Sequence, residues 1–130
     1  MLVVDASAIC AIALREPDSR RLQEILADTN APIMSPVNAW EVSVSLERRR
    51  LADSRAWLDR FYATIDLRIV DIGEQETRDA LAAWRQFGKG RHPARLNLGD
   101  CFAYALAKSR NLPLLYKGAD FAKTDVRSAL

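Results

Sequence analysis

The chain has 130 residues, of which 49% are hydrophobic and 28% charged, a composition typical of one globular domain with a substantial core. Its 19 Lys and Arg residues face 17 Asp and Glu residues, and the formal net charge of +2 excludes binding to nucleic acid by bulk charge alone. A polyanion would have to be held by a local patch or through metal ions. We expect a single domain over residues 1–130.

The first half of the chain alternates short apolar runs with longer segments of helical period. In chain order the sequence predicts a strand at 2–4, a helix at 7–15, a helix with Leu22, Ile25 and Leu26 on one face, a strand at 31–35 and a helix at 35–50. Ser35 is the expected N-cap of the last of these helices, and Pro36 suits its first turn.

The second half continues the alternation. The expected elements are a helix at 54–65, a strand at 67–72, a helix at 74–87, a loop at 88–97, a helix at 98–110, a strand at 112–118 and a short edge strand within 120–126. Trp57 and Phe61 lie on an apolar face that serves either the core or a dimer contact. Strands separated by helices predict an α/β fold, with a mainly parallel sheet of four to five strands covered on both faces.

The two cysteines and the longest apolar runs indicate the compartment. Cys10 and Cys101 lie in apolar, helix-like stretches without CxxC spacing, so we expect buried free thiols rather than a disulfide framework or a zinc site. No apolar run approaches the roughly eighteen residues of a membrane span, and no leader with a cleavage site is evident. These features predict a cytoplasmic protein that does not contact a membrane.

Four acidic residues fall near the ends of predicted strands or the starts of predicted helices. Asp5 ends the first strand, Glu41 lies in the first turns of the helix after the second strand, and Asp120 comes just past the fourth strand. In a parallel sheet these three positions share the carboxyl edge, where functional groups gather. Asp100 lies in the first turn of a helix that follows a long loop, and topology alone does not fix which edge it reaches.

Each acid also has a structural interpretation. Asp5 can cap the following helix, Asp120 can be a turn residue, and both Asn38…Glu41 and Asn97…Asp100 fit the spacing of a capping box. A shared edge favours function, because clustered carboxylates repel one another and at neutral pH hold a proton or a cation. Carboxylate oxygens without Cys or His favour Mg²⁺ or Mn²⁺, which points to phosphoryl chemistry.

Polar and basic residues accompany the acids. The Ser7 hydroxyl can cap a helix, bond a ligand carboxylate or bond a metal-bound water. The loop "GKGRHPAR" brings Lys89, Arg91, His92 and Arg95 close before Asp100, where they can hold a nucleic-acid backbone or form a solvated surface.

Other patterns exclude two kinds of catalytic site. With His92 as its only histidine and no G-x-S-x-G motif, the chain lacks the residues for a multi-histidine metal site or an acyl-transfer elbow. Arg48, Arg49 and Arg50 end a helix, where cations complement the helix dipole.

Four stretches together resemble one family: "VVDASAI", "SPVNAWEVSVSL", "GKGRHPARLNLGDCFAYALAK" and "PLLYKGADFAKTDV". The chain resembles PIN-domain ribonucleases, specifically the VapC-type toxins of bacterial toxin–antitoxin pairs. The resemblance implies an α/β/α sandwich and hydrolysis of RNA phosphodiester bonds with Mg²⁺ or Mn²⁺. It assigns the acidic pocket to Asp5, Glu41, Asp100 and Asp120, with Asp125 as the alternative fourth acid and Asp5 and Asp100 as the direct metal ligands.

The resemblance also implies partners. A toxin of this type forms a homodimer, here through the helices that carry Trp57 and Phe61, and is silenced by a small VapB-type antitoxin whose tail fills the acidic pocket. Ser7 stands where the family carries Ser or Thr, and Arg91, His92 and Arg95 are candidate contacts for RNA.

Three other interpretations compete. In a phosphorylation-receiver domain Asp71 would be the phosphoacceptor, although Ala6 stands where receivers carry a second acid and Lys117 precedes Gly rather than Pro. A dehalogenase-like phosphatase would need an acid where Ser7 stands. A catalytically inert scaffold would explain the helices but not the placement of four acids.

Overall fold

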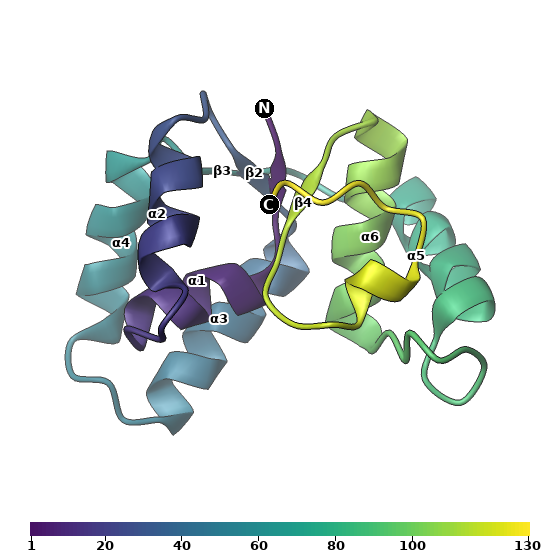
Figure 1. The fold of residues 1–130 in the computed structure, drawn as a ribbon, viewed down its shortest axis with the longest axis horizontal. Coiled ribbons are helices and arrows are strands. Elements are labelled where there is room, and N and C mark those ends of the chain that lie inside the picture. The colour runs from purple at the N-terminus through teal and green to yellow at the C-terminus, as the bar shows by residue number, and fades with distance from the viewer.

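The computed structural model describes residues 1–130 and places a four-stranded sheet between two layers of helices (Figure 1). All strand pairings are parallel, in the order β3-β2-β1-β4. The strands are β1 (Val3–Val4), β2 (Ile33–Met34), β3 (Arg68–Ile69) and β4 (Leu114–Leu115). The α/β/α architecture and the parallel sheet predicted from the sequence are therefore confirmed.

The six predicted helices are all present. They are α1 (Ala6–Ala13), α2 (Ser19–Ala27), α3 (Pro36–Arg48), α4 (Ser54–Thr64), α5 (Glu74–Phe87) and α6 (Leu98–Arg110). The expected N-cap of α3 is confirmed, because Ser35 Oγ accepts a hydrogen bond from Val37 N at 3.2 Å. Each helix lacks either the length or the hydropathy that a membrane span requires.

The short strands divide the core into two halves. Side chains alternate between the faces of a strand, so neighbouring residues enter opposite layers. Val3 and Leu114 join the cluster beneath α5 and α6, whereas Val4 and Leu115 join the cluster beneath α1 to α4. Burial of both faces explains why β1, β2 and β4 read as continuous apolar runs, whereas the two residues of β3 are exposed.

The free cysteines follow the prediction in part. Neither forms a disulfide; Cys101 is buried in the core, whereas Cys10 is half-buried.

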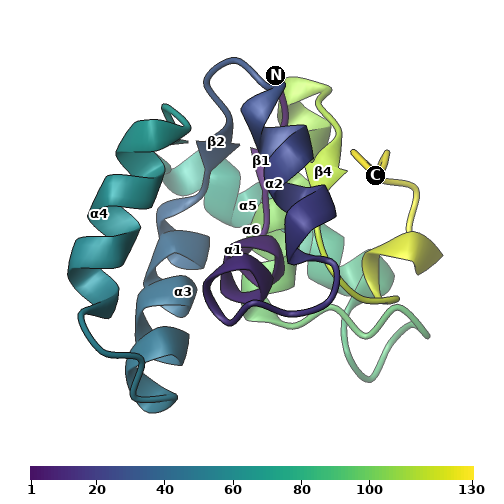
Figure 2. The ribbon, with the colours of Figure 1, turned by 60° about the vertical axis from the view of Figure 1, so that its left-hand side comes forward.

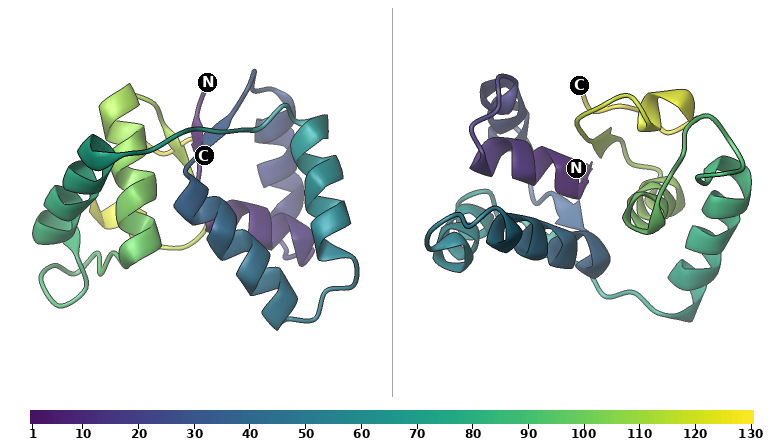
Figure 3. Two further views of the ribbon diagram at one scale, coloured as in Figure 1. Left: turned by 180° about the vertical axis from the view of Figure 1, so that it is seen from behind. Right: turned by 90° about the horizontal axis from the view of Figure 1, so that it is seen from below.

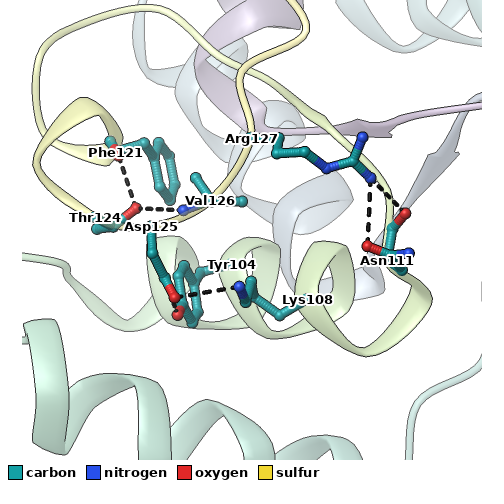
Figure 4. A network of polar contacts seen from close by, with 8 residues as sticks. All are labelled: Tyr104, Lys108, Asn111, Phe121, Thr124, Asp125, Val126 and Arg127. Atoms are coloured by element: carbon teal, nitrogen blue, oxygen red, sulfur yellow. Dashed lines mark hydrogen bonds and ion pairs between the residues drawn. The ribbon is translucent and has the colours of Figure 1, made fainter.

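The predicted edge strand within 120–126 is wrong. A 3₁₀ turn, η1 (Phe121–Lys123), occupies this segment, and the chain pairs with β4 only later, through a single bridge between Leu114 and Ser128. The turn is closed by Thr124, whose Oγ1 donates to Phe121 O at 2.7 Å and accepts from Val126 N at 3.2 Å (Figure 4). Local hydroxyl–backbone bonds of this kind compete with strand pairing, and here they bury Phe121 against Tyr116.

The carboxyl edge of the sheet gathers the starts of three helices. The chain enters α1 directly from β1 and α3 directly from β2, and α6 also begins at this edge before running back to β4 (Figure 1). The view from below shows α1, α3 and α6 around the same edge (Figure 3, right). The order of strands and helices did not predict which edge Asp100 reaches. The structure places it at the carboxyl edge, where Asp5 also lies.

Candidate active site

Asp5 is both a helix cap and a buried acid. Its Oδ2 accepts hydrogen bonds from Ser7 N at 3.0 Å and from Ser7 Oγ at 2.5 Å, and the side chain is only 4% exposed. Burial raises the pKa of Asp5, while the two bonds from Ser7 oppose that rise. Ser7 Oγ also accepts from Lys117 N at 3.0 Å, which ties the Asp5 carboxylate to the end of β4.

Glu41 is held by an asparagine that the sequence analysis did not single out as functional. Fully buried Asn38 donates from Nδ2 to Glu41 Oε1 at 2.8 Å and to Gly99 O at 3.0 Å, which links α3 to α6. The capping-box interpretation of Asn38 and Glu41 is wrong, because Ser35 caps α3 and Asn38 lies inside the helix. Burial raises the pKa of Glu41, and the charge of Asp5 raises it further.

Gly99 is the second residue that sequence reasoning missed. A Cβ at this position would lie 2.0 Å from Glu41 Oε1, so the Glu41 carboxylate packs directly on the first turn of α6. The one available signal was a glycine inside a predicted helix, where it is unfavourable without a packing reason. Glycine at 99 therefore lets Glu41 lie beside the helix turn that carries Asp100.

Asp100 forms the predicted capping box, and its pKa is nevertheless raised. Its Oδ2 accepts from Asn97 N at 3.0 Å, and Asn97 Oδ1 accepts from Asp100 N at 2.9 Å. Burial raises the pKa of Asp100 to about 7, and the charges of Asp5, Glu41 and Asp120 add to the rise against the Asn97 N–H. The charges of the other three acids thus all act on Asp100.

Asp120 and Asp125 have different surroundings. Asp120 is exposed just before η1, and its charge acts on Asp100. Asp125 instead accepts from Tyr104 Oη at 2.5 Å and from Lys108 Nζ at 3.2 Å (Figure 4). The geometry thus favours Asp120 over Asp125 as the fourth acid of the cluster.

The acidic cluster has no cationic partner. None of Asp5, Glu41, Asp100 and Asp120 forms an ion pair with a Lys, Arg or His side chain. As the side chains lie, no three Asp, Glu, His or Cys residues stand close enough together to hold one metal ion. The cluster is therefore a set of hard oxygen donors whose charge is uncompensated by the protein.

The basic loop divides into structural and exposed residues. His92 is half-buried with its ring edge-on to Phe87 at 5.0 Å, and its Nδ1 accepts from Ala94 N at 3.0 Å. The Arg91 guanidinium lies 4.7 Å from the centre of the Trp84 ring, while Arg95 is exposed. His92 thus braces the loop, and the arginines lie at its surface; RNA contacts by these three residues stay a prediction.

Comparison with known proteins identifies the family. The sequence model of the PIN domain matches residues 2–127. A protein named Ribonuclease VapC from Mycolicibacterium smegmatis is 39% identical over 125 residues, which cover 96% of this chain and 97% of the relative.

Two solved structures share the fold. One is VapC20 of Mycobacterium tuberculosis, described as a sarcin–ricin loop cleaving toxin, with a TM-score of 0.75, 16% identity and coverage of 98% of this chain and 99% of that one. The other, a toxin–antitoxin complex from Klebsiella pneumoniae, has a TM-score of 0.71 and 17% identity over 96% of this chain and 93% of that one. The chain belongs to the PIN-domain family and, within it, to the VapC ribonucleases.

Proposed function

We propose that the chain is a divalent-metal-dependent endoribonuclease and the toxin of a toxin–antitoxin pair. The observation that carries the proposal is the unpaired acidic cluster, in which burial and then the charges of the neighbouring acids raise the pKa of Asp100 to about 7. Such an arrangement destabilises the protein on its own and is typical of a site that binds a cation. The proposed domain spans residues 1–130.

Asp5 and Asp100 are the proposed ligands of Mg²⁺ or Mn²⁺, whose preference for hard oxygen donors they meet. A bound ion of this kind lowers the pKa of a coordinated water and neutralises charge on the attacked phosphate. The chain's own part is orientation: Ser7 fixes the Asp5 carboxylate, and Asn97 fixes that of Asp100. Each acid keeps one oxygen that none of these bonds occupies, at Oδ1 in both cases.

The proposed role of Glu41 is proton transfer, and that of Asp120 is at the solvent side of the acidic cluster. Asn38 holds Glu41 through Oε1, which leaves Oε2 able to hold or accept a proton from an attacking water. Burial and then the charge of Asp5 raise the pKa of Glu41, which favours its holding a proton. Asp120 is exposed and lies at the solvent side of the cluster.

The proposed substrate and partners follow from the relatives. A relative is named a ribonuclease and a structural neighbour is a toxin–antitoxin complex, which supports RNA as substrate and an antitoxin as partner. A homodimer through α4 also stays a proposal: the rings of Trp57 and Phe61 stack there at 4.9 Å and both are half-buried. Nothing favours the receiver interpretation, in which Asp71 would accept a phosphoryl group.

Cleavage of total RNA by matched aspartate variants tests the proposal. Wild-type protein with Mn²⁺ should cleave RNA, and EDTA should stop the cleavage. Asp5→Asn should abolish cleavage while preserving the N-cap of α1, because an asparagine oxygen can still accept the hydrogen bond from Ser7 N. Asp71→Asn, which also changes an aspartate after a strand, should cleave as the wild type does. Intact RNA with the wild type, or equal cleavage by Asp5→Asn, would contradict the proposal.

A further inference from the structure

A hollow extends along α3 from Glu41, one of the four acids of the acidic cluster. It has a volume of about 400 Å³ and is lined by Trp40, Glu41, Val44, Ser45, Arg48 and Arg49. All six residues belong to α3 or its C-terminal cap, and the helix extends away from the sheet (Figure 2). Glu41 belongs to both the acidic cluster and this hollow, so the two sites are continuous.

The far end of the hollow carries positive charge without a partner. Arg48 and Arg49 are exposed, and neither forms an ion pair. The helix dipole explains why cations are favoured at the end of α3. It does not explain why two of the three consecutive arginines line the same hollow as Glu41.

The near end of the hollow carries an exposed aromatic ring. Trp40 is 67% exposed although tryptophan is usually well buried, and it directly precedes Glu41. An exposed tryptophan beside arginines is the combination that proteins use to bind single-stranded nucleic acid, where rings stack on bases and cations bind phosphates. The charge and the ring together favour a polyanion with planar bases over an acidic peptide.

We propose that this hollow binds the single-stranded stretch of RNA next to the cleaved phosphodiester, with Arg48 and Arg49 on its phosphates and Trp40 stacked on a base. The inference rests on the proposed ribonuclease function. Seven to eight residues of helix rise about 10–12 Å, so the arginines would contact phosphates farther along the strand than the one beside Glu41. The hollow thereby supplies binding on the α3 side of the site, opposite the basic loop before α6.

Binding of a short 5′-fluorescein-labelled oligouridylate, followed by fluorescence anisotropy over a series of KCl concentrations, tests the subsite. The measurement uses the full chain with Asp100→Asn in EDTA, so that the RNA stays intact. Arg48→Gln/Arg49→Gln should flatten the salt dependence of log K by about 1.4, since each phosphate contact of a single strand contributes about 0.7. Trp40→Leu should weaken binding about tenfold without changing that slope.

The control removes the same charge elsewhere. Arg21→Gln/Arg50→Gln changes two exposed arginines that do not line the hollow and should retain the slope of the parent. The proposal is overturned if Arg48→Gln/Arg49→Gln keeps that slope, as it would if the hollow bound a peptide, or if both double variants lose it equally. Thermal unfolding should show the same Tm for both double variants.

Total-RNA cleavage with intact Asp100 separates the two proposals. A wild type that cleaves RNA with Mn²⁺, together with an unchanged slope in Arg48→Gln/Arg49→Gln, would overturn the subsite alone. A wild type that leaves RNA intact would overturn the proposed function.

Discussion

Asp100 and Asp125 lie near the same helix but in opposite electrostatic situations. Asp100 lies in the first turn of α6, where Asp5, Glu41 and Asp120 act on it, and its pKa is raised to about 7 by burial and by those charges. Asp125 packs on a later part of α6, where the Tyr104 hydroxyl and then the Lys108 ammonium lower its pKa (Figure 4). The surroundings of Asp100 disfavour its ionised form, whereas those of Asp125 favour it.

This difference indicates that Asp125 stabilises the fold, whereas Asp100 serves the proposed site. The bonds of Asp125 join the C-terminal segment to α6 and stabilise the fold, since a charged acceptor strengthens a hydrogen bond. The cluster around Asp100 lowers stability until a cation compensates its charge. Substituting each aspartate by asparagine should therefore have opposite effects.

The largest expected effect is on cleavage by Asp100→Asn. Loss of a metal ligand should reduce RNA cleavage by at least about a hundredfold, since even residues that only support metal ligands are worth roughly 10–100-fold. In EDTA near neutral pH the same variant should unfold at higher urea concentration than the wild type. Asp125→Asn should keep full cleavage and lose at most about 1 kcal/mol, because its ion pair is exposed. The opposite pattern would reverse the two roles.

A methyl group at position 99 should damage the site without unfolding the protein. In Gly99→Ala the added Cβ would displace the Glu41 carboxylate, and a misplacement of this size costs up to about a hundredfold in rate. The free energy of unfolding should change by less than about 1 kcal/mol. The higher helix propensity of alanine, worth about 1 kcal/mol over glycine, offsets the cost of moving the Glu41 side chain. Gly73→Ala is the control, since its Cβ would meet only Glu76 Oε2 at 3.8 Å. Equal cleavage by both variants would show that Glu41 needs no fixed position.

The stability of the metal-free protein should fall as pH rises. Asp100 has a folded pKa of about 7, above its ordinary value of 3.8, so the folded state holds the proton more tightly than the unfolded state. The resulting stability is complete below pH 3.8 and is lost as pH rises through about 7. Allowing for partial exposure, we expect a loss of about 1–2 kcal/mol between about pH 5 and about pH 7.5.

Urea unfolding in EDTA checks this dependence. Asp100→Asn should flatten the dependence, and Asp5 and Glu41, whose pKa values are also raised, should account for what remains. If the wild type became more stable as the pH rose over this range, the conclusion that the folded protein disfavours ionised Asp100 would be wrong.

The smallest effect should come from Tyr104→Phe. This change removes the hydroxyl that donates to Asp125 at 2.5 Å and should lower the free energy of unfolding by about 1 kcal/mol. The pKa of Asp125 should rise, which carbon NMR of the carboxyl group measures. RNA cleavage should stay within about twofold of the wild type; a larger loss would connect the Tyr104–Asp125 network to the site.

The sequence predicted the parts of the site that follow from topology. Asp5, Glu41 and Asp120 come after strands of a parallel sheet, so alternation of strands and helices suffices to bring them to one edge. Asp100 required more, because its helix follows a long loop, and the motif resemblance supplied its place.

The sequence did not predict the contacts that cross between elements. The Asn38 bond to Gly99 O and the space that Gly99 leaves for Glu41 join residues about sixty positions apart, and no local pattern encodes them. The strand predicted within 120–126 was wrong for a different reason. There the Thr124 hydroxyl bonds to the local backbone and closes a turn, and these bonds take the place of strand pairing.

Calorimetric titration of Mn²⁺ into the wild type, Asp100→Asn and Asp125→Asn measures whether Asp100 holds a divalent cation. We predict that the wild type and Asp125→Asn bind Mn²⁺ with equal affinity and that Asp100→Asn has lost this binding. Equal binding by all three proteins, or binding by none, would contradict the account and return Asp5 and Asp100 to the role of helix caps.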